Sequence, residues 1–120
     1  MAICLESAGE HIGNIYLREI DGVSRRAQLH VFIGNRRHRG KGYGQAAVRE
    51  LLRHAFLDLN LNRVYLEVLA DNVAAVKTYE KCGFQAEGRM KEHAFKVGRY
   101  KDVLVMGINR SQFRQLEEHK

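Results

Sequence analysis

The first residues whose types and spacing suit chemistry are those of the segment RGKGYG, residues 39–44. Gly40, Gly42 and Gly44 take every second position. Glycine lowers the stability of a helix or a strand by roughly 0.5 to 1 kcal/mol, so this spacing indicates a backbone that passes close to another group. The chemistry it suits is the binding of an anion such as a phosphate, because glycines let a ligand approach the unpaired N–H groups of a following helix.

The segments on either side predict a strand before these glycines and a helix after them. Residues 27–33 alternate between two faces, with Ala27, Leu29, Val31 and Ile33 on one of them, which is the period of a strand. After the glycines, apolar residues recur at helical spacing. These are Val48, Leu51, Leu52, Ala55, Phe56 and Leu59. The order of strand, glycine loop and amphipathic helix favours an anion site, and a flexible loop with a helix cap is the alternative.

The composition predicts a single domain over residues 1–120. Of its residues 45% are hydrophobic and 28% charged, enough to bury a modest core. The sequence contains no long apolar run and no charged leader, so we expect no membrane segment, no signal peptide and a cytoplasmic protein. Cys4 and Cys82 suit reduced thiols and give no disulfide framework. The formal net charge of +6 fits an anionic ligand, and equally a basic solvated surface.

The first half of the chain predicts a meander followed by a parallel pair. Residues 3–6 and 13–20 indicate an antiparallel hairpin, which residues 27–33 extend by a third strand. The helix after the glycines runs to about Leu59, and residues 63–69, RVYLEVL, predict the next strand. A strand, a helix and a strand in this order are most simply a βαβ unit with parallel strands.

The second half predicts a short helix and two more strands. Asn72 is a suitable N-cap for a helix, and Gly83 a suitable residue to end it. Residues 84–90 and 101–108 predict strands joined by a polar segment, and the tail after them is charged. The expected fold is α/β (α+β): a mixed, mostly antiparallel sheet with a central parallel strand pair and helices on both faces.

Two well-known phosphate loops fit the glycines poorly. A Walker loop needs a glycine separated by four residues from its Gly-Lys pair and a Ser or Thr after it, but Asn35 and Gly42 take these positions. A dinucleotide fingerprint fits better, through Gly42, Gly44 and Ala47 with Glu67 downstream. In that fold, however, the first glycine follows the strand almost at once, whereas eight residues separate them here.

A third pattern fits two separate segments. Arg39, Gly42 and Gly44 form R-x-x-G-x-G, which resembles the pyrophosphate-binding motif of the GNAT family of N-acetyltransferases. Residues 66–84, LEVLADNVAAVKTYEKCGF, resemble the strand, splayed loop and helix of this family, with its pattern N-x-x-A-x-x-x-Y-x-x-x-G-F. The resemblance extends from about residue 13 to residue 108. Its pattern is most similar to the ribosomal-protein and spermidine-type enzymes, which implies acetyl transfer from acetyl-CoA to a peptide N-terminus or a small primary amine.

The resemblance also implies a cofactor site. In the family, acetyl-CoA lies in a V between two parallel strands that diverge. By similarity, the backbone of residues 31–33 would bind the pantetheine arm, residues 39–44 would surround the pyrophosphate, and Asn72 would contact the cofactor from the second strand's loop. The implied cofactor-binding residues are Val31, Phe32, Ile33, Arg39, Gly40, Lys41, Gly42, Tyr43, Gly44 and Asn72.

Two catalytic residues follow from the same resemblance. The implied reaction would be direct attack of a neutral amine on the thioester, which needs a base for the ammonium proton and an acid for the leaving thiolate. Tyr79 matches the position of the tyrosine acid in many relatives, and its alternative role is to pack on the sheet. Glu67 matches the glutamate base of the ribosomal-protein enzymes, and its alternative is an exposed strand residue without a function.

A second group of relatives, which includes spermidine acetyltransferases, has a glutamate on the strand before the glycine loop. Here the corresponding residue is Gln28, which cannot act as a base. His30 lies two residues further on the same face and could replace it, directly or through water, or could be a strand histidine with only a structural role. The base is therefore Glu67, His30 or a water. We find no grouping of residues with metal-ligand spacing and expect no metal.

The chain departs from the family pattern at its start. Only 26 residues precede the strand that leads into the glycines, whereas family members usually begin with a further strand and two helices that form the wall of the acceptor site. The alternative function is a non-catalytic CoA-binding module that has lost this segment. A homodimer would be a common way to cover the exposed surface. A nucleic-acid partner through RRHRGK is disfavoured, because this basic segment has no aromatic platform.

Overall fold

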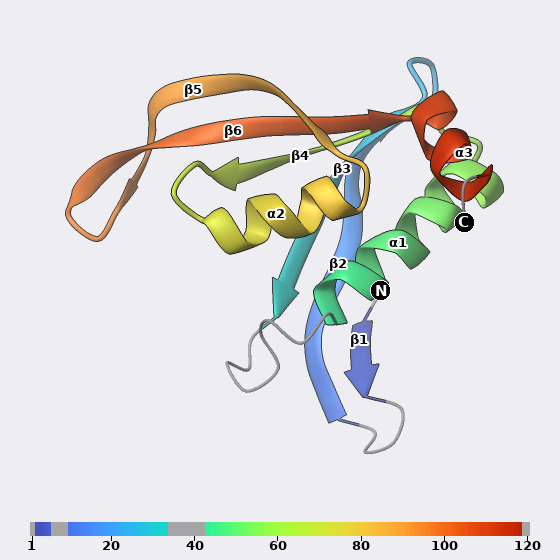
Figure 1. Ribbon diagram of the computed structural model, residues 1–120, viewed down its shortest axis with the longest axis horizontal. Coiled ribbons are helices and arrows are strands. Elements are labelled where there is room, and N and C mark those ends of the chain that lie inside the picture. Colours follow the sequence, from blue (N-terminus) through green and yellow to red (C-terminus); the bar gives the residue numbers. More distant parts are fainter. Residues whose placement is uncertain (1, 6–9, 34–42, 119–120) are drawn as a thin grey trace.

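The computed structural model describes residues 2–5, 10–33 and 43–118, and the side chains of residues 15–31 and 44–118. In this part of the chain, six strands form one sheet in the order β1-β2-β3-β4-β6-β5 (Figure 1). The strands are β1 (Ala2–Leu5), β2 (Glu10–Asp21), β3 (Arg26–Ile33), β4 (Arg63–Leu69), β5 (Gln85–Lys96) and β6 (Arg99–Asn109). The helical elements are α1 (Tyr43–Arg53), the π-helical turn η2 (His54–Asp58), α2 (Val73–Lys81) and α3 (Arg110–Glu118).

The topology confirms the predicted fold class. β3 and β4 pair in parallel and are joined through α1, while the other paired neighbours in the described sheet are antiparallel. The predicted ends of α2 are also confirmed: the side chain of Asn72 accepts a hydrogen bond from the N–H of Ala75 at 3.3 Å. Gly83 follows the helix with φ of +105°, a conformation that L side chains rarely adopt.

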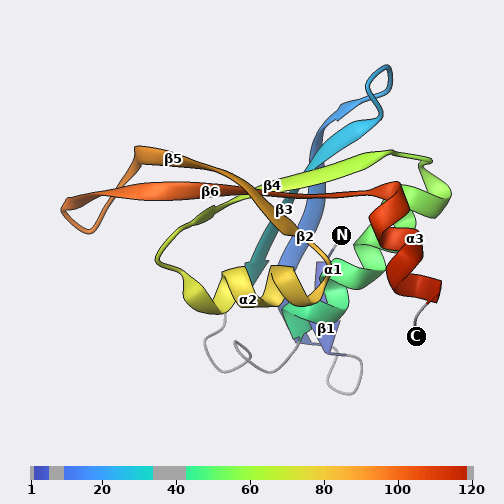
Figure 2. The ribbon, with the colours of Figure 1, turned by 45° about the horizontal axis from the view of Figure 1, so that its top comes forward.

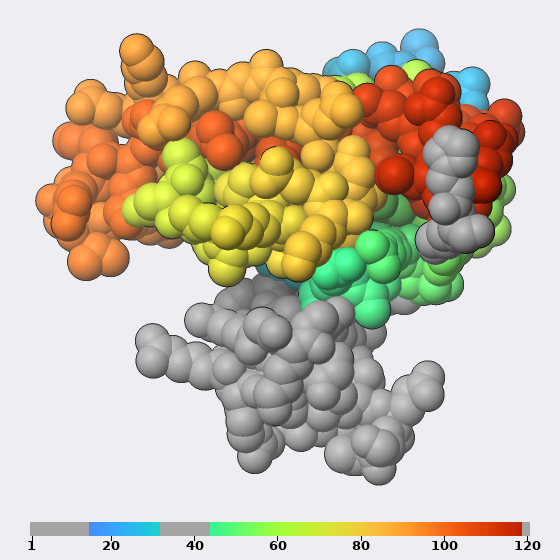
Figure 3. All heavy atoms as spheres, viewed as in Figure 1, coloured from blue at the N-terminus to red at the C-terminus, as the bar shows by residue number. Residues whose placement is uncertain are grey.

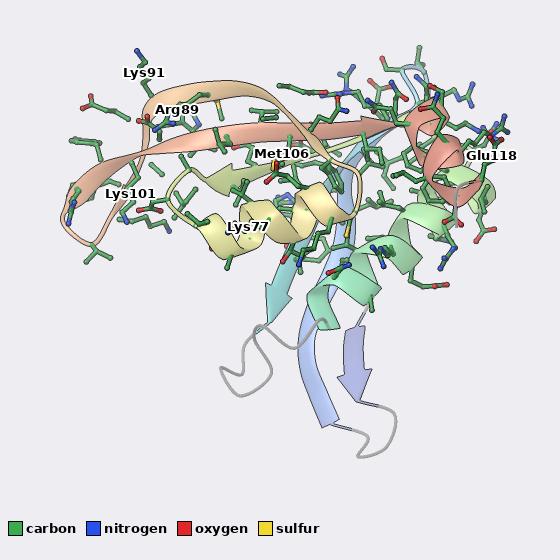
Figure 4. The ribbon with its side chains drawn as sticks, in the orientation of Figure 1. Lys77, Arg89, Lys91, Lys101, Met106 and Glu118 are labelled. Carbon is green, nitrogen blue, oxygen red and sulfur yellow. The ribbon has the colours of Figure 1, made fainter. Side chains whose placement is uncertain are left out.

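The described helices lie on one face of the sheet, although the sequence pattern predicts helices on both faces (Figure 2). The reason is that alternate strand positions, such as Leu29 of β3 and Leu66 of β4, enter one hydrophobic cluster shared by α1, η2 and α3. Met106 of β6, labelled in Figure 4, belongs to the same cluster and is 1% exposed. The opposite face of β2, β3 and β4 carries no helix in the described part of the chain.

The final two strands are longer than the sequence predicts. In place of two short strands and a polar connection, β5 and β6 form one hairpin that turns at Val97 and Gly98. Register shifts between Ala86 and Gly88, and between Met90 and Ala94, interrupt the apolar alternation while the ladder continues. Figure 3 shows this hairpin above α2, and Figure 4 shows Lys91 projecting from it.

The charged tail forms a helix, α3, which the sequence pattern did not predict. The N–H of Asn109 donates to Oε1 of Gln112, and the N–H of Gln112 donates to Oδ1 of Asn109, both at 2.9 Å. This reciprocal arrangement is a capping box, which supplies partners for free N–H groups at a helix start. Phe113, one residue later, is buried against Phe56 of η2 at a ring-centroid distance of 5.1 Å. The cap and this aromatic contact help to hold the tail on the core.

An ion pair between β4 and β5 crosses β6 at Gly107. The Nη1 and Nη2 atoms of Arg63 lie 2.6 and 2.5 Å from the two carboxylate oxygens of Glu87. A Cβ at Gly107 would lie 2.5 Å from Oε2 of Glu87, so glycine leaves room for the pair. The hydrogen bonds from Arg63 lower the pKa of Glu87 below its usual 4.5.

We expect Glu87→Gln to lower the free energy of unfolding at pH 7 and to have little effect in strong acid. A carboxylate with a lowered folded-state pKa stabilises the fold above its unfolded value of 4.5, and this contribution is lost as the pH falls through the lowered folded value. Urea unfolding at pH 7 and in strong acid measures the difference. Glu80→Gln, on the exposed surface of α2, is the matched control. An equal effect of Glu87→Gln at both pH values would contradict the assignment.

Candidate active site

The strands β3 and β4 pair over only three residues and then diverge. The parallel pairs are Arg26 with Arg63, Ala27 with Val64, and Gln28 with Tyr65. β3 nevertheless continues to Ile33 and β4 to Leu69, and their arrowheads point in different directions in Figures 1 and 2. Backbone groups on the β4 side of β3 beyond Gln28 are therefore free of the ladder between these two strands, and an extended ligand can bind to them.

α1 is the first described element after β3 in the chain. Tyr43 and Gly44 are its first two residues, so the predicted helix does follow the glycine loop directly. Arg39, Gly40, Lys41 and Gly42 lie outside the described residues, and so does the predicted contact of this loop with a pyrophosphate. Phe32 and Ile33 end β3, but their side chains are outside the described part.

Tyr79 lies on α2, with its side chain packed against the hydrophobic cluster. Its ring meets that of Phe84 edge-on at a centroid distance of 5.9 Å. Two contacts attach α2 to α1: Nη2 of Arg49 donates to the carbonyl of Lys81 at 3.3 Å, and Sγ of Cys82 lies 3.7 Å from the carbonyl of Gln45. Burial, with a smaller contribution from Cys82, raises the pKa of Tyr79 above its usual 10.0, so this phenol keeps its proton at neutral pH.

Glu67 lies on the other face of the sheet, just beyond the last paired residues of β3 and β4. Its side chain is exposed, and its Oε2 accepts a hydrogen bond from Nε2 of Gln28 at 3.4 Å across the diverging strands. The fold therefore brings Gln28 of β3 and Glu67 of β4 together where the two strands begin to diverge. Asn72, by contrast, uses its side-chain oxygen to cap α2, which leaves its amide N–H groups for other partners.

Two aromatic residues that the sequence pattern did not single out, Tyr16 and Tyr65, also lie on this face. The rings of Tyr16 and His30 are stacked, with centroids 5.4 Å apart and planes within 8°. The hydroxyl of Tyr65 lies 3.5 Å from Oε2 of Glu19. The register of β2 and β3 places Tyr16 directly opposite His30, and the sequence predicts the two strands but not this register.

The parting of β3 and β4 and the helix after the glycines are the arrangement that the resemblance to the GNAT family implies. The family model described as an acetyltransferase (GNAT) domain matches residues 1–85, and the chain belongs to this family. It is 38% identical to spermidine N(1)-acetyltransferase of Vibrio cholerae over 107 residues, which cover 89% of this chain and 61% of that protein. It is 31% identical to the putative ribosomal N-acetyltransferase YdaF of Bacillus subtilis over 83% of this chain and 54% of that protein.

The structural comparison agrees. The spermidine/spermine N-acetyltransferase SpeG from Vibrio cholerae, solved in complex with manganese ions, superposes with a TM-score of 0.85 at 36% identity. The match covers 92% of this chain and 64% of that one. The chain thus spans about three fifths of the length of the curated spermidine acetyltransferases that it matches. The relatives support the resemblance that the two sequence motifs carried.

Two kinds of feature are absent from the described residues. None of the described helices is long and apolar enough to cross a membrane. Among the same residues, no cluster of three or more histidine, cysteine, aspartate or glutamate side chains could hold a metal ion.

Proposed function

We propose that this chain forms a single acetyltransferase domain that transfers an acetyl group from acetyl-CoA to a primary amine by direct attack. The observation that carries this proposal is the separation of β3 and β4 beyond Gln28, with α1 following the glycine loop and Glu67 lying on the opposite face. Where this pairing ends, the helices lie on one face of the sheet and the carboxylate of Glu67 lies on the other. Membership of the GNAT family supports the same reaction.

The residues of this chain fit the cofactor. The backbone of Val31, Phe32 and Ile33 would bind the pantetheine arm, because β3 there has no partner in β4. Arg39, Gly40, Lys41, Gly42, Tyr43 and Gly44 would bind the pyrophosphate at the start of α1, with an amide N–H of Asn72 as a further donor. When bound, acetyl-CoA supplies the acetyl group as an activated thioester.

Two residues would handle the protons. Tyr79 keeps its phenol proton at neutral pH, since burial raises its pKa, and can donate that proton to a thiolate. Glu67 would bind the ammonium form of the acceptor and help to remove its proton. Its exposed position on the helix-free face lets an amine reach it from solvent.

The acceptor that this face suits is a small amine or a peptide N-terminus. Two exposed carboxylates, those of Glu19 and Glu67, attract an ammonium group, and the exposed ring of Tyr16 offers a cation the face that is not stacked on His30. Relatives named as spermidine N(1)-acetyltransferases make a polyamine the first acceptor to test.

The cellular location and the oligomeric state are also part of the proposal. The free thiol of Cys82, buried and reduced, suits a cytoplasmic protein. Phe95, Val97 and Tyr100 are 62%, 94% and 67% exposed on the β5–β6 hairpin, and a homodimer would cover such apolar surface.

Acetyl-CoA is expected to stabilise the protein against heat. At a hundredfold excess over its Kd it adds about 2.7 kcal/mol, which corresponds to a rise in Tm of roughly 10 °C for a domain of this size. Differential scanning calorimetry with acetyl-CoA, and with glutathione as a control thiol, measures this. Free CoA released in the presence of spermidine or short peptides then reports the transfer.

The outcomes separate the candidate functions. No rise in Tm would refute an acetyl-CoA site. A rise in Tm without CoA release across the amine panel would instead identify the alternative, a CoA-binding module without catalysis.

A further inference from the structure

His30 occupies a special position in β3. It is two residues beyond Gln28, the last residue of β3 that pairs with β4, and it lies on the same face as Gln28 because side chains alternate along a strand. Glu67 lies on this face too and is hydrogen-bonded to Gln28. His30 therefore stands where the gap between β3 and β4 opens, on the side from which an acceptor amine would approach.

The imidazole of His30 is fixed on one side and lacks a partner on another. Tyr16 stacks on its ring with nearly parallel planes, which orients it. Its Nε2 is buried and has no hydrogen-bond partner among the described residues. A buried polar atom without a partner destabilises the fold, so such an exception needs a reason.

The neighbours do not supply this partner. On β2, Tyr16 stacks on the ring, and Arg18 is paired in register with Gln28 rather than with His30. On β4, the hydroxyl of Tyr65 is directed to Glu19, while Glu67 accepts from Gln28. These are the charged and titratable groups that face His30 from the described side chains of both neighbouring strands. Among the described residues, Nε2 thus remains available for a hydrogen bond with a ligand.

We propose that His30 takes the proton from the ammonium group of the acceptor, after Glu67 has bound that group as its counter-ion. This deepens the proposed function and rests on it. Imidazoles ordinarily titrate at about pH 6.5 and carboxylates at about pH 4, so an imidazole is the better proton acceptor near neutral pH. Gln28, which stands where related enzymes have a glutamate, cannot take the proton.

The proton balance closes with Tyr79. One proton moves from the ammonium nitrogen to Nε2 of His30, which frees the nitrogen lone pair to form a bond with the acetyl carbon. As the carbon–sulfur bond breaks, its electron pair goes to sulfur, which takes the phenol proton of Tyr79. The amide nitrogen then loses its second proton, which restores the phenol. The proton on His30 leaves to solvent, so one proton is released per acetyl group transferred.

The first experiment compares His30→Gln with the wild-type protein. Glutamine keeps hydrogen-bonding capacity but cannot accept a proton, so kcat/KM should fall by about 100-fold or more. The dependence of kcat/KM on pH should also differ between the wild-type protein and the variant. His54→Gln is the matched control, because His54 is exposed in η2 on the helix side, where it bonds to Asp58. Circular dichroism verifies that both variants fold.

A second readout does not depend on turnover. The imidazole ¹⁵N signals of the wild-type protein are followed by NMR while spermidine, or a tripeptide with a free N-terminus, is added. We expect the His30 signal to shift and the His54 signal to stay. This measurement uses the wild-type protein and needs no variant to fold. If none of the amines is acetylated, the proposed function fails. The NMR signals still show whether an amine contacts His30.

A rescue variant distinguishes chemistry from structure. In the double variant His30→Gln with Gln28→Glu, a new carboxylate would face Glu67 across the 3.4 Å now spanned by Gln28. Two carboxylates at this distance raise the pKa of one of them, which provides a base nearer neutral pH. We expect at least a tenfold recovery of kcat/KM. Unchanged kcat/KM and pH profile in His30→Gln, together with an unshifted His30 signal, would overturn the inference.

Discussion

Tyr79→Phe is expected to reduce kcat for acetyl transfer by about 10²- to 10⁴-fold without unfolding the protein, since a positioned proton donor contributes this much. The phenol is held in its protonated form because burial raises its pKa. Phenylalanine keeps the ring and therefore the edge-on contact with Phe84. Only the hydroxyl is removed, so the loss should appear in kcat, with little change in the affinity for acetyl-CoA measured by calorimetry.

The control for this substitution is Tyr100→Phe. Tyr100 is 67% exposed on β6 and its ring lies 5.1 Å from that of Phe95, so it loses the same hydroxyl far from the gap between β3 and β4. We expect its kcat to match that of the wild-type protein. An equally small effect of both substitutions would show that Tyr79 only packs on the sheet and that another group, or water, protonates the thiolate.

The central part of the fold could be predicted because its signals are local. The strand ending at Ile33, the glycines before α1 and the strand Arg63–Leu69 each carry their own periodicity. Asn72 and Gly83 likewise mark the ends of α2 by their chemistry alone. A strand, a helix and a strand in sequence then leave few topologies to consider.

The C-terminal part was harder to predict because its structure depends on distant partners. β5 is exposed along most of its length and has two register shifts, so its sequence shows no apolar alternation that would predict a strand. It is a strand because it pairs with β6. The tail becomes a helix because Phe113 reaches Phe56, a contact between residues 57 positions apart. Local secondary-structure propensity does not predict contacts between residues that are far apart in the sequence.

The candidate site divides in the same way. The family motifs indicated Tyr79 and Glu67, and the parting of β3 and β4 now gives Glu67 a place beside Gln28. The motifs could not show that Tyr16 stacks on His30, because this depends on the register of a hairpin. A register shift by one residue would move Tyr16 to the opposite face.

Phe56→Ala is expected to reduce the free energy of unfolding by about 3–5 kcal/mol, a large share of the roughly 5–15 kcal/mol that stabilises a typical domain. Phe56 is fully buried in η2, where it joins the hydrophobic cluster and packs on Phe113. Its removal leaves a cavity between the sheet, η2 and α3. The last helix should therefore loosen first, which hydrogen exchange of the amides of residues 110–118 would report.

Urea unfolding followed by circular dichroism measures the loss, with Phe95→Ala as the matched control. Phe95 is 62% exposed, and its ring contacts Tyr100 on the hairpin, so its truncation should cost less than about 1 kcal/mol. The same substitution thus has two very different expected costs, because burial rather than residue type sets the cost. Comparable losses for the two variants would mean that η2 does not anchor α3 to the core.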